Sequence, residues 1–599
     1  MMKLTEHYLQ LRDSLGNTVE NEDFTITIDE LADILCCTPR YTKKIMKEMH
    51  NQNWINWKVA YGRGKRPTLT FLKNKGEVLF EVAKSHIRSG RYKEGLQTIS
   101  SVGPPYQQLL NDWLVNQFGY IEESHQDEQL DILRYPFYYS IVHLDPAHIN
   151  SIHENHLVDH IFDTLLVYNL QTKSVEPHLA HHYESSEDGM KWRFYLRKGV
   201  YFHHGRELTA NDIVQSFQRL KETAFHNKSM IRNIRSVDVV KTWMVEFTLF
   251  KPDYLFPHAL CHKQLSIIPL EIYQNAREGF TKLPTGTGPF KITKHDESMI
   301  RLDAHQHYFK GRPHLDRVEI ITLADLDQTT KRDFTDYFSH DVSEKNSPMY
   351  WEEVQQPEEG ATYITFNLFK GGPHQSIKVR EAINYAIDKD ALCDFLGGKH
   401  IFPADSQLIN ETDKTYVNQY NPDKSKELLH EAGYSGETLT LYATQLRKNA
   451  SVRKEAFWIK EQCEKVGIMV DVHVVPINDL LREQTRKKAD MIIGGVAFGN
   501  DIVYSFYRYL QMPASFVKNL MGKELGSVIE SQLMKVVQEP DMDRQMGYLL
   551  ELERMIKGDF AIIHLYHRSH AINVNSNSQL QGVSLEGFGR VNYKDLWFK

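Results

Sequence analysis

Residues 38–72 read TPRYTKKIMKEMHNQNWINWKVAYGRGKRPTLTFL, and this stretch predicts a helix followed by two strands. Thr38 can cap a helix and Pro39 suits its first position, so we expect a helix that ends near Gln52. At about 100° per residue, the side chains of this helix separate into two faces. The predicted buried face carries Tyr41, Ile45, Met46 and Met49. The opposite face is basic and carries Arg40, Lys43, Lys44 and Lys47.

The residues on either side of this helix complete a recognisable pattern. Residues 54–60 and 68–72 read as strands, and the basic tip GRGKRP at 62–67 joins them. Before the helix, residues 29–35 predict a short helix, with Cys36 and Cys37 in the turn. An opening helix within residues 4–15 and a strand at 24–28 precede these elements. This order is that of a winged helix-turn-helix, whose second helix enters the major groove of DNA.

The pattern predicts contacts with double-stranded DNA from the second helix and from the hairpin tip. Arg and Lys side chains pair with phosphates and can read guanine edges. The predicted DNA-binding residues are Arg40, Thr42, Lys43, Lys44, Lys47, Arg63, Lys65 and Arg66. The alternative interpretation is a solvated basic face without a role in DNA binding.

The charge of the chain is unevenly distributed. The whole chain has 71 Lys+Arg against 78 Asp+Glu, a formal net charge of −7. Residues 40–75 hold ten basic residues and one acidic residue, Glu48, so this stretch is +9 and the rest of the chain is −16. A basic module on an acidic chain indicates a polyanionic partner for that module alone.

Residues 1–118 are predicted to form the DNA-binding domain together with a helical extension. Helical spacing continues through 76–99 and 106–118, with a break at Gly103-Pro104-Pro105. This extension is either a packing element or a dimer surface. The short, polar and acidic residues 119–130 predict a linker. Residues 131–599 alternate strand-like and helix-like segments as α/β domains do.

The composition predicts a cytoplasmic protein with reduced thiols. The 599 residues are 41% hydrophobic and 25% charged, which excludes a collagen, a wholly disordered chain and a coiled-coil rod. Apolar runs such as residues 491–498 are too short to span a bilayer, and residues 1–10 lack the apolar core of a signal peptide. The five cysteines form no CxxC pair. We therefore expect no membrane association.

Several blocks in the second part resemble the family 5 solute-binding proteins, the oligopeptide- and nickel-binding type. The signature blocks are HIFDTLLVYNL at 160–170, EPHLA at 176–180, SSEDG at 185–189 and LTANDIVQSFQRL at 208–220. Further blocks follow in order: GTGPF at 286–290, YFKGRPHLDR at 308–317, VREAINYAID at 379–388 and YNPDKSKELLHEAG at 420–433. The resemblance implies a two-lobed, periplasmic-binding-protein-like (type II) α/β module across residues 131–599.

A winged helix fused to such a module resembles the SgrR family of transcriptional regulators. The fold class is thus an α/β multidomain chain with an N-terminal winged helix-turn-helix. The resemblance implies a regulator whose DNA affinity responds to a small-molecule effector held between two lobes, with a sugar or sugar phosphate as the candidate. Lobe one is expected at about 131–325 and 505–599, and lobe two at about 326–504. A homodimer would double the DNA contact, although no coiled-coil heptads enforce one.

One departure from the family bears on the ligand. Peptide binders of family 5 carry a tract like GW-x-ADY-x-DP, whose first Asp pairs with the peptide α-amino group. Here the tract is GGVAFGNDIV at 494–503: Val496 replaces the Trp and Gly499 stands at the amine-binding Asp. A buried ammonium without that carboxylate would lose several kcal/mol, so a neutral or anionic ligand fits better. The candidate ligand-binding residues are Tyr139, Asn500 and Asp501, with core packing as the favoured alternative for Tyr139.

Metal binding and catalysis have little support in the sequence. His153, His156 and His160 have i, i+3, i+7 spacing, but packing explains them better than a shared ion does. The sequence contains no GxSxG, HExxH, P-loop or dinucleotide-binding motif. We therefore expect neither a cofactor nor an enzyme. The competing hypothesis is a cytoplasmic solute- or peptide-binding protein without sequence-specific DNA binding.

Overall fold

The computed structural model describes residues 2–16, 18–59, 66–100, 102–115, 117–125, 128–137, 141–149, 151–223, 228–323, 338–339, 351–397, 401–445, 454–512, 515–575, 579–586 and 590–599. The chain forms two compact units. Unit 1 comprises Met1–Ser140, Ile292–Asp303 and Leu315–Tyr337, and unit 2 comprises Ile141–Lys291, Ala304–His314 and Phe338–Lys599. Within the described ranges, no helix is both long and apolar enough to cross a membrane.

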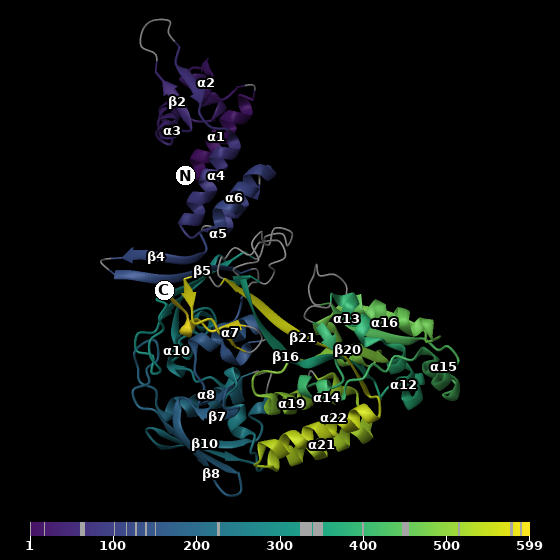
Figure 1. Ribbon diagram of the computed structural model, residues 1–599. Coiled ribbons are helices and arrows are strands. Elements are labelled where there is room, and N and C mark those ends of the chain that lie inside the picture. Colours follow the sequence, from purple (N-terminus) through teal and green to yellow (C-terminus); the bar gives the residue numbers. More distant parts are fainter. Residues whose placement is uncertain are drawn as a thin grey trace. The chain divides into compact units, whose positions relative to one another are not determined.

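The start of unit 1 has the element order of a winged helix (Figure 1). Its elements are α1 (Met2–Ser14), β1 (Asp23–Thr25), α2 (Ile28–Ile34), α3 (Pro39–Asn51), β2 (Ile55–Lys58) and β3 (Thr68–Phe71). The strands form an antiparallel sheet in the order β1-β3-β2. Thr27 and Glu30 form a capping box before α2, and the Thr38 hydroxyl accepts a hydrogen bond from the Tyr41 N–H at the start of α3. The element order predicted for this region is therefore confirmed.

The helical extension packs against a second sheet of unit 1. It consists of α4 (Lys75–Arg88), α5 (Tyr92–Ser100) and α6 (Pro104–Val115). Ile87 and Leu114 share a buried cluster with Met299 and Ile321, which lie on sheet strands. At Gly95 a Cβ atom would lie 2.9 Å from the Ala83 carbonyl oxygen, so the close approach of α5 to α4 requires glycine. This contact makes the extension a packing element of unit 1.

Residues 119–130, predicted as a linker, instead contribute to a hairpin. The strands β4 (Gly119–His125) and β5 (Glu128–Phe137) pair antiparallel. They complete a five-stranded sheet in the order β12-β13-β14-β5-β4, with β12 (Phe290–His295), β13 (Met299–Ala304) and β14 (Arg317–Thr322). The polar residues of β4 are compatible with a strand because it lies at the edge of the sheet. Strands β5, β13 and β14, expected in lobe one, therefore belong to unit 1.

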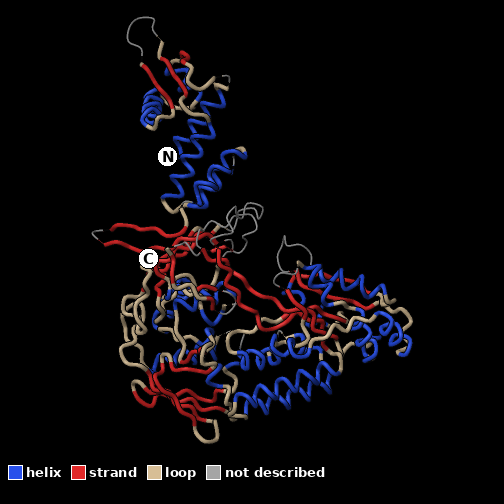
Figure 2. The backbone as a smooth tube through the Cα atoms, viewed as in Figure 1, coloured by secondary structure: helices blue, strands red, loops and turns tan. Residues whose placement is uncertain are grey.

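Unit 2 has two large hydrophobic cores. The first core is built on a four-stranded sheet in the order β10-β11-β9-β8. Its elements include β6 (Leu166–Asn169), β8 (Ala180–Ser185), β9 (Lys191–Leu196), α8 (Ala210–Glu222), β10 (Ile234–Lys241), β11 (Met244–Leu249) and α9 (Phe256–Ala259). The helices α19 (Ile502–Gln511), α21 (Gly522–Gln538) and α22 (Met542–Gly558) also contribute to it, and α21 and α22 run side by side (Figures 1 and 2). The helix α7 (Ile152–Ile161) precedes β6 in the chain.

The second core surrounds the other large sheet of unit 2. Its strand order is β15-β21-β16-β20-β18-β19, with β17 (Ile401–Pro403) paired to β21. The strands are β15 (Phe338–Ser339), β16 (Trp351–Phe366), β18 (Leu439–Gln445), β19 (Val470–Pro476), β20 (Met491–Gly495) and β21 (Ile562–Asn575). Helices α12 (Ile377–Ala386), α13 (Lys389–Leu396), α15 (Pro422–Glu431) and α16 (Lys454–Lys465) cover it (Figure 1). After β20 the chain leaves the second core and continues through residues 496–501 into α19, which packs in the first core.

Candidate DNA-binding face and ligand pocket

The helix α3 exposes its basic side chains and buries its apolar ones. Arg40, Lys43, Lys44 and Lys47 are all exposed. Ile45, Met46 and Met49 are at most 2% exposed and pack with Tyr8 and Trp54. Lys44 lies 3.8 Å from the carboxylate of Glu48 on the same helix. Because both side chains are exposed, this i, i+4 ion pair is weak. Four cations of one helix are thus presented to solvent together.

The structure corrects two assignments on this helix. Thr42, predicted to contact DNA, is fully buried, and its hydroxyl donates to the Thr38 carbonyl oxygen at 3.1 Å. Tyr41, predicted to be buried, is 43% exposed. The buried positions 42, 45, 46 and 49 follow the i, i+3, i+4, i+7 spacing of one helix face. Thr42 therefore supports the helix rather than binding DNA, and Tyr41 joins the exposed side.

The hairpin tip is only partly described. Arg66 is exposed just before β3, whereas Arg63 and Lys65 lie outside the described residues. Lys58, at the end of β2, lies 3.7 Å from Asp23, and both side chains are largely exposed. The described residues thus place exposed cations on α3 and at the base of the hairpin.

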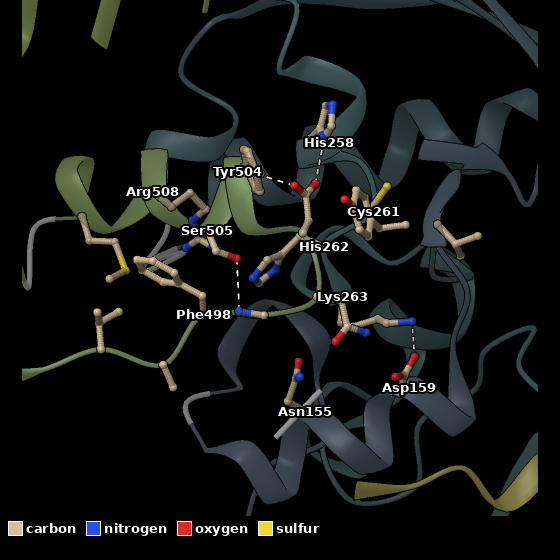
Figure 3. A pocket seen from close by; sticks show the side chains of 18 of the residues that line it. Asn155, Asp159, His258, Cys261, His262, Lys263, Phe498, Tyr504, Ser505 and Arg508 are labelled. Carbon is tan, nitrogen blue, oxygen red and sulfur yellow. Dashed lines mark hydrogen bonds and ion pairs between the residues drawn. The ribbon is translucent and has the colours of Figure 1, made fainter. Parts of the chain in front are cut away.

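Unit 2 contains a pocket of about 420 Å³ (Figure 3). Its walls come from α7, β6, residues 258–263, the tract at 496–501 and α19. Among the described residues, the elements around the second core contribute nothing to its lining. The pocket therefore lies beside the first core and is lined by the segment that follows β20. Asn500 and Asp501, which were predicted to bind a ligand, line this pocket, and Tyr139 lies outside the described residues.

The carboxylate of Asp501 already has structural partners. It accepts a hydrogen bond from the Tyr504 N–H at 3.1 Å, which caps α19, and it lies 2.6 Å from Nδ1 of His258. The side chains of Asp501 and His258 are 11% and 9% exposed. The neighbouring Gly499 donates its N–H to the Ser505 hydroxyl at 3.2 Å. The tract therefore offers no free carboxylate at the place where peptide binders hold an ammonium group.

A family comparison identifies the module that contains this pocket. The model described as bacterial extracellular solute-binding proteins, family 5 Middle, matches residues 174–515, more than half of the chain. The chain belongs to this family. The model described as sugar transport-related sRNA regulator N-term matches residues 3–120. The chain thus combines an N-terminal region of the SgrR type with a family 5 module.

Two relatives are similar to the chain over nearly its full length. A Bacillus subtilis (strain 168) protein called uncharacterized protein YhjP is 32% identical over 609 residues, which cover 100% of both chains. The HTH-type transcriptional regulator SgrR of Yersinia enterocolitica is 25% identical over 96% of this chain and 95% of its own. The Yersinia relative is thus described as a transcriptional regulator.

Solved structures share the fold of the family 5 module. NikA from Brucella suis, in complex with Fe(III)-EDTA, superposes with a TM-score of 0.68 at 18% identity and covers 78% of this chain and 100% of its own. DppA from Helicobacter pylori, in complex with the peptide STSA, gives a TM-score of 0.63 at 21% identity, over 78% and 98% of the two chains. These identities show the fold alone.

Two of the three histidines considered for metal binding, His156 and His160, pack against Tyr593 in the family 5 module. The rings of His156 and His160 have centroids 4.8 Å apart, and His160 stacks on Tyr593 at 4.4 Å. Burial lowers the pKa of His160 to about 4. Within the described residues, no group of three or more His, Cys, Asp or Glu side chains could hold a metal ion.

Replacing Asp501 should distinguish its structural role from a ligand-binding role. Asp501→Ala removes the α19 cap, worth about 1 kcal/mol, and leaves buried His258 without its partner, at about 1–3 kcal/mol. We expect the free energy of unfolding to fall by roughly 2–4 kcal/mol in the absence of any ligand. Asp501→Asn, which can still cap the helix and accept a hydrogen bond, should lose about 1 kcal/mol or less. Urea denaturation of the full chain measures both values, and an Ala variant as stable as wild type contradicts this role.

Proposed function

We propose that the protein is a DNA-binding transcriptional regulator whose activity is modulated by a small solute bound in its family 5 module. The observation that carries this proposal is the exposed basic face of α3, with Arg40, Lys43, Lys44 and Lys47, on a domain that matches the N-terminal region of SgrR-type proteins. Exposed cations on the second helix of a winged helix pair with DNA phosphates and base edges. The proposal places the protein in the cytoplasm, where its operator is accessible.

The solute would act by binding two states of the protein unequally. Residues 496–501, where the chain passes from the second core to the first, line the pocket, so a solute bound there can favour one arrangement of the two cores over another. A ligand shifts such an equilibrium only by its differential affinity for the two states, typically about 1–3 kcal/mol. The solute is neutral or anionic because Asp501 is occupied, and a sugar or sugar phosphate is the candidate given by the family resemblance. A homodimer is part of the proposal.

The decisive experiment measures binding of the purified full chain to DNA from its own upstream region. Fluorescence anisotropy would be recorded at two salt concentrations, with random DNA as competitor. We expect salt-sensitive binding that is at least about 1000-fold tighter than binding to random DNA. Equal affinity for both DNAs contradicts the regulator. That result would favour a cytoplasmic solute- or peptide-binding protein whose basic face acts only through electrostatics.

A further inference from the structure

One end of the pocket in unit 2 collects hydrogen-bond donors around a cation that has no acidic partner among the described residues. Arg508 lies on α19 and lines the pocket. No described side chain or carbonyl oxygen accepts a hydrogen bond from its guanidinium, and its recorded contact is with the ring of Tyr504, at 5.9 Å. Burial lowers the pKa of Arg508, so the guanidinium is partly dehydrated without a counter-charge. An anion in the pocket would supply that charge.

The other charged side chains in the lining are already paired. Lys263 forms an ion pair with Asp159, and Asp501 is held by His258 and by the start of α19. In Figure 3 the Lys263–Asp159 pair is drawn well away from Arg508. Among the described lining residues, Arg508 is therefore the cation available to a ligand, and neither carboxylate is available to an ammonium group.

Ser505 adds a second donor on the same face of α19. It lies three residues before Arg508, so the two side chains share one helix face. The Ser505 oxygen accepts the Gly499 N–H at 3.2 Å, which leaves its own O–H to donate. Figure 3 shows Arg508 and Ser505 on the side of the pocket where Phe498 lies.

His262 supplies a third donor, and its protonation state can be deduced. Burial, reinforced by the charges of Arg508 and Lys263, lowers the pKa of His262 well below its usual value, so the imidazole is neutral at pH 7. Its Nδ1 accepts a hydrogen bond from the Gln264 N–H at 3.3 Å. A neutral imidazole that accepts at Nδ1 carries its proton on Nε2. Nε2–H is therefore a donor on this side of the pocket.

We propose that Arg508, Ser505 and His262 form an oxyanion-binding site that recognises a phosphate or carboxylate group of the solute. The proposal rests on the proposed function, since it specifies the ligand class of the same pocket. A guanidinium can bind either group through two parallel charge-assisted hydrogen bonds, and Ser505 and His262 can donate to remaining oxygens. The site selects against a peptide amino terminus, because that ammonium group would meet Arg508 and no free carboxylate.

The test uses inorganic phosphate and succinate as probes on the purified full chain. Thermal melting would be followed over a range of probe concentrations, with ionic strength matched by potassium chloride. We expect at least one probe to raise Tm with increasing concentration beyond the chloride control. A response to phosphate alone identifies a phosphorylated solute, and a response to succinate alone identifies a carboxylated one. If neither probe raises Tm above the chloride control, the proposal is wrong.

Substitutions at Arg508 connect the response to this site. Arg508→Gln should weaken binding of the responding probe at least tenfold by isothermal titration calorimetry. Arg508→Lys, which keeps the charge but loses the planar fork, should give an intermediate value and serves if the Gln variant does not fold. The K43A/K44A/K47A variant should still respond, which excludes phosphate binding to α3 as the cause. A Gln variant that binds the probe as tightly as wild type overturns the assignment.

The same preparation separates this proposal from the proposed function. DNA binding of the wild-type chain is measured without probe. If the chain binds a probe through Arg508 but does not bind its upstream DNA specifically, the oxyanion site is supported and the proposed regulatory function is contradicted. If the chain binds its upstream DNA specifically but no probe raises its Tm, the proposed function is supported and the oxyanion site is wrong.

Discussion

The K43A/K44A/K47A variant should lose most of the salt-dependent DNA affinity of the wild-type chain. The three lysines are exposed on one side of α3, and each is expected to neutralise a phosphate. The logarithm of affinity falls with the logarithm of salt concentration by about 0.9 for each neutralised phosphate. Removing three phosphate contacts should therefore reduce this slope by about 2.7. Raising the salt from about 50 to 200 mM should then weaken DNA binding of the variant by a factor roughly 40-fold smaller than the factor for the wild-type chain.

A matched variant controls for the change in net charge. Lys414, Lys426 and Lys487 are exposed lysines in or directly after helices of unit 2, each paired with an acidic residue three or four positions away. Such pairs contribute less than about 0.5 kcal/mol each, so K414A/K426A/K487A should fold normally and keep the wild-type salt slope. Thr42→Ala is not an equivalent test, since Thr42 is buried. Equal slopes for the α3 variant and wild type, with both folded, would exclude α3 as the DNA-binding helix.

The second large effect should be loss of stability in acid. Burial lowers the pKa of His160 to about 4, of His203 to about 3 and of His567 to about 4. Each of these histidines binds its proton more readily when unfolded, with a pKa of about 6.5. Between about pH 6.5 and 4 the unfolded chain thus holds more protons, and stability falls as the pH falls, by about 1.4 kcal/mol per pH unit for each histidine.

One buried carboxyl group acts in the opposite direction. Burial raises the pKa of Asp253 to about 6, so protonation between about pH 6 and 4 favours the folded state and offsets about one histidine. The net loss should be about 3 kcal/mol per pH unit. This loss is a large part of the roughly 5–15 kcal/mol by which domains are typically stable, so we expect the urea midpoint of unit 2, followed by circular dichroism, to fall steadily from about pH 6.5 to about pH 4.

His160→Phe provides a specific test of this acid effect. The His160 ring is buried and stacked on Tyr593, and its Nε2 atom has no hydrogen-bond partner among the described residues. A phenyl ring can occupy the same stack and takes up no proton, so the slope of stability against pH should decrease by about 1.4 kcal/mol per unit. His182→Phe, at an exposed position, should leave the slope unchanged. A His160→Phe slope equal to that of wild type would rule out His160 as a contributor.

Most of the winged helix was predictable because its signals are local. Helix caps, proline at a first helical turn and apolar periodicity act within a few residues, and α2, α3 and the two hairpin strands occur where these signals place them. The error at Tyr41 and Thr42 arose from assigning the larger aromatic residue to the core. The spacing of 42, 45, 46 and 49 already satisfied one helix face and could have identified Thr42 as buried.

The candidate pocket was only partly predictable. The tract at 494–503 was recognisable, and Asn500 and Asp501 do line the pocket. His258, His262 and Arg508 were missed, because the sequence around them carries no motif that marks a binding residue. The i+7 spacing from Asp501 could have placed Arg508 two turns along the same helix. That no described residue pairs its charge could not have been inferred from the sequence.

The sequence by itself determined the order of the elements, the basic face of one helix and the membership of the second part in family 5. These properties depend on apolar periodicity, on helix caps and on family sequence blocks that occur in a set order, and all three can be identified in the sequence itself. The tertiary structure decided that residues 119–125 complete a sheet as an edge strand and that Asp501 is occupied by His258, 243 positions away. The physical reason is that sheet pairing and charge neutralisation depend on contacts between segments that are far apart in the sequence. Only the folded path of the chain brings such segments into contact.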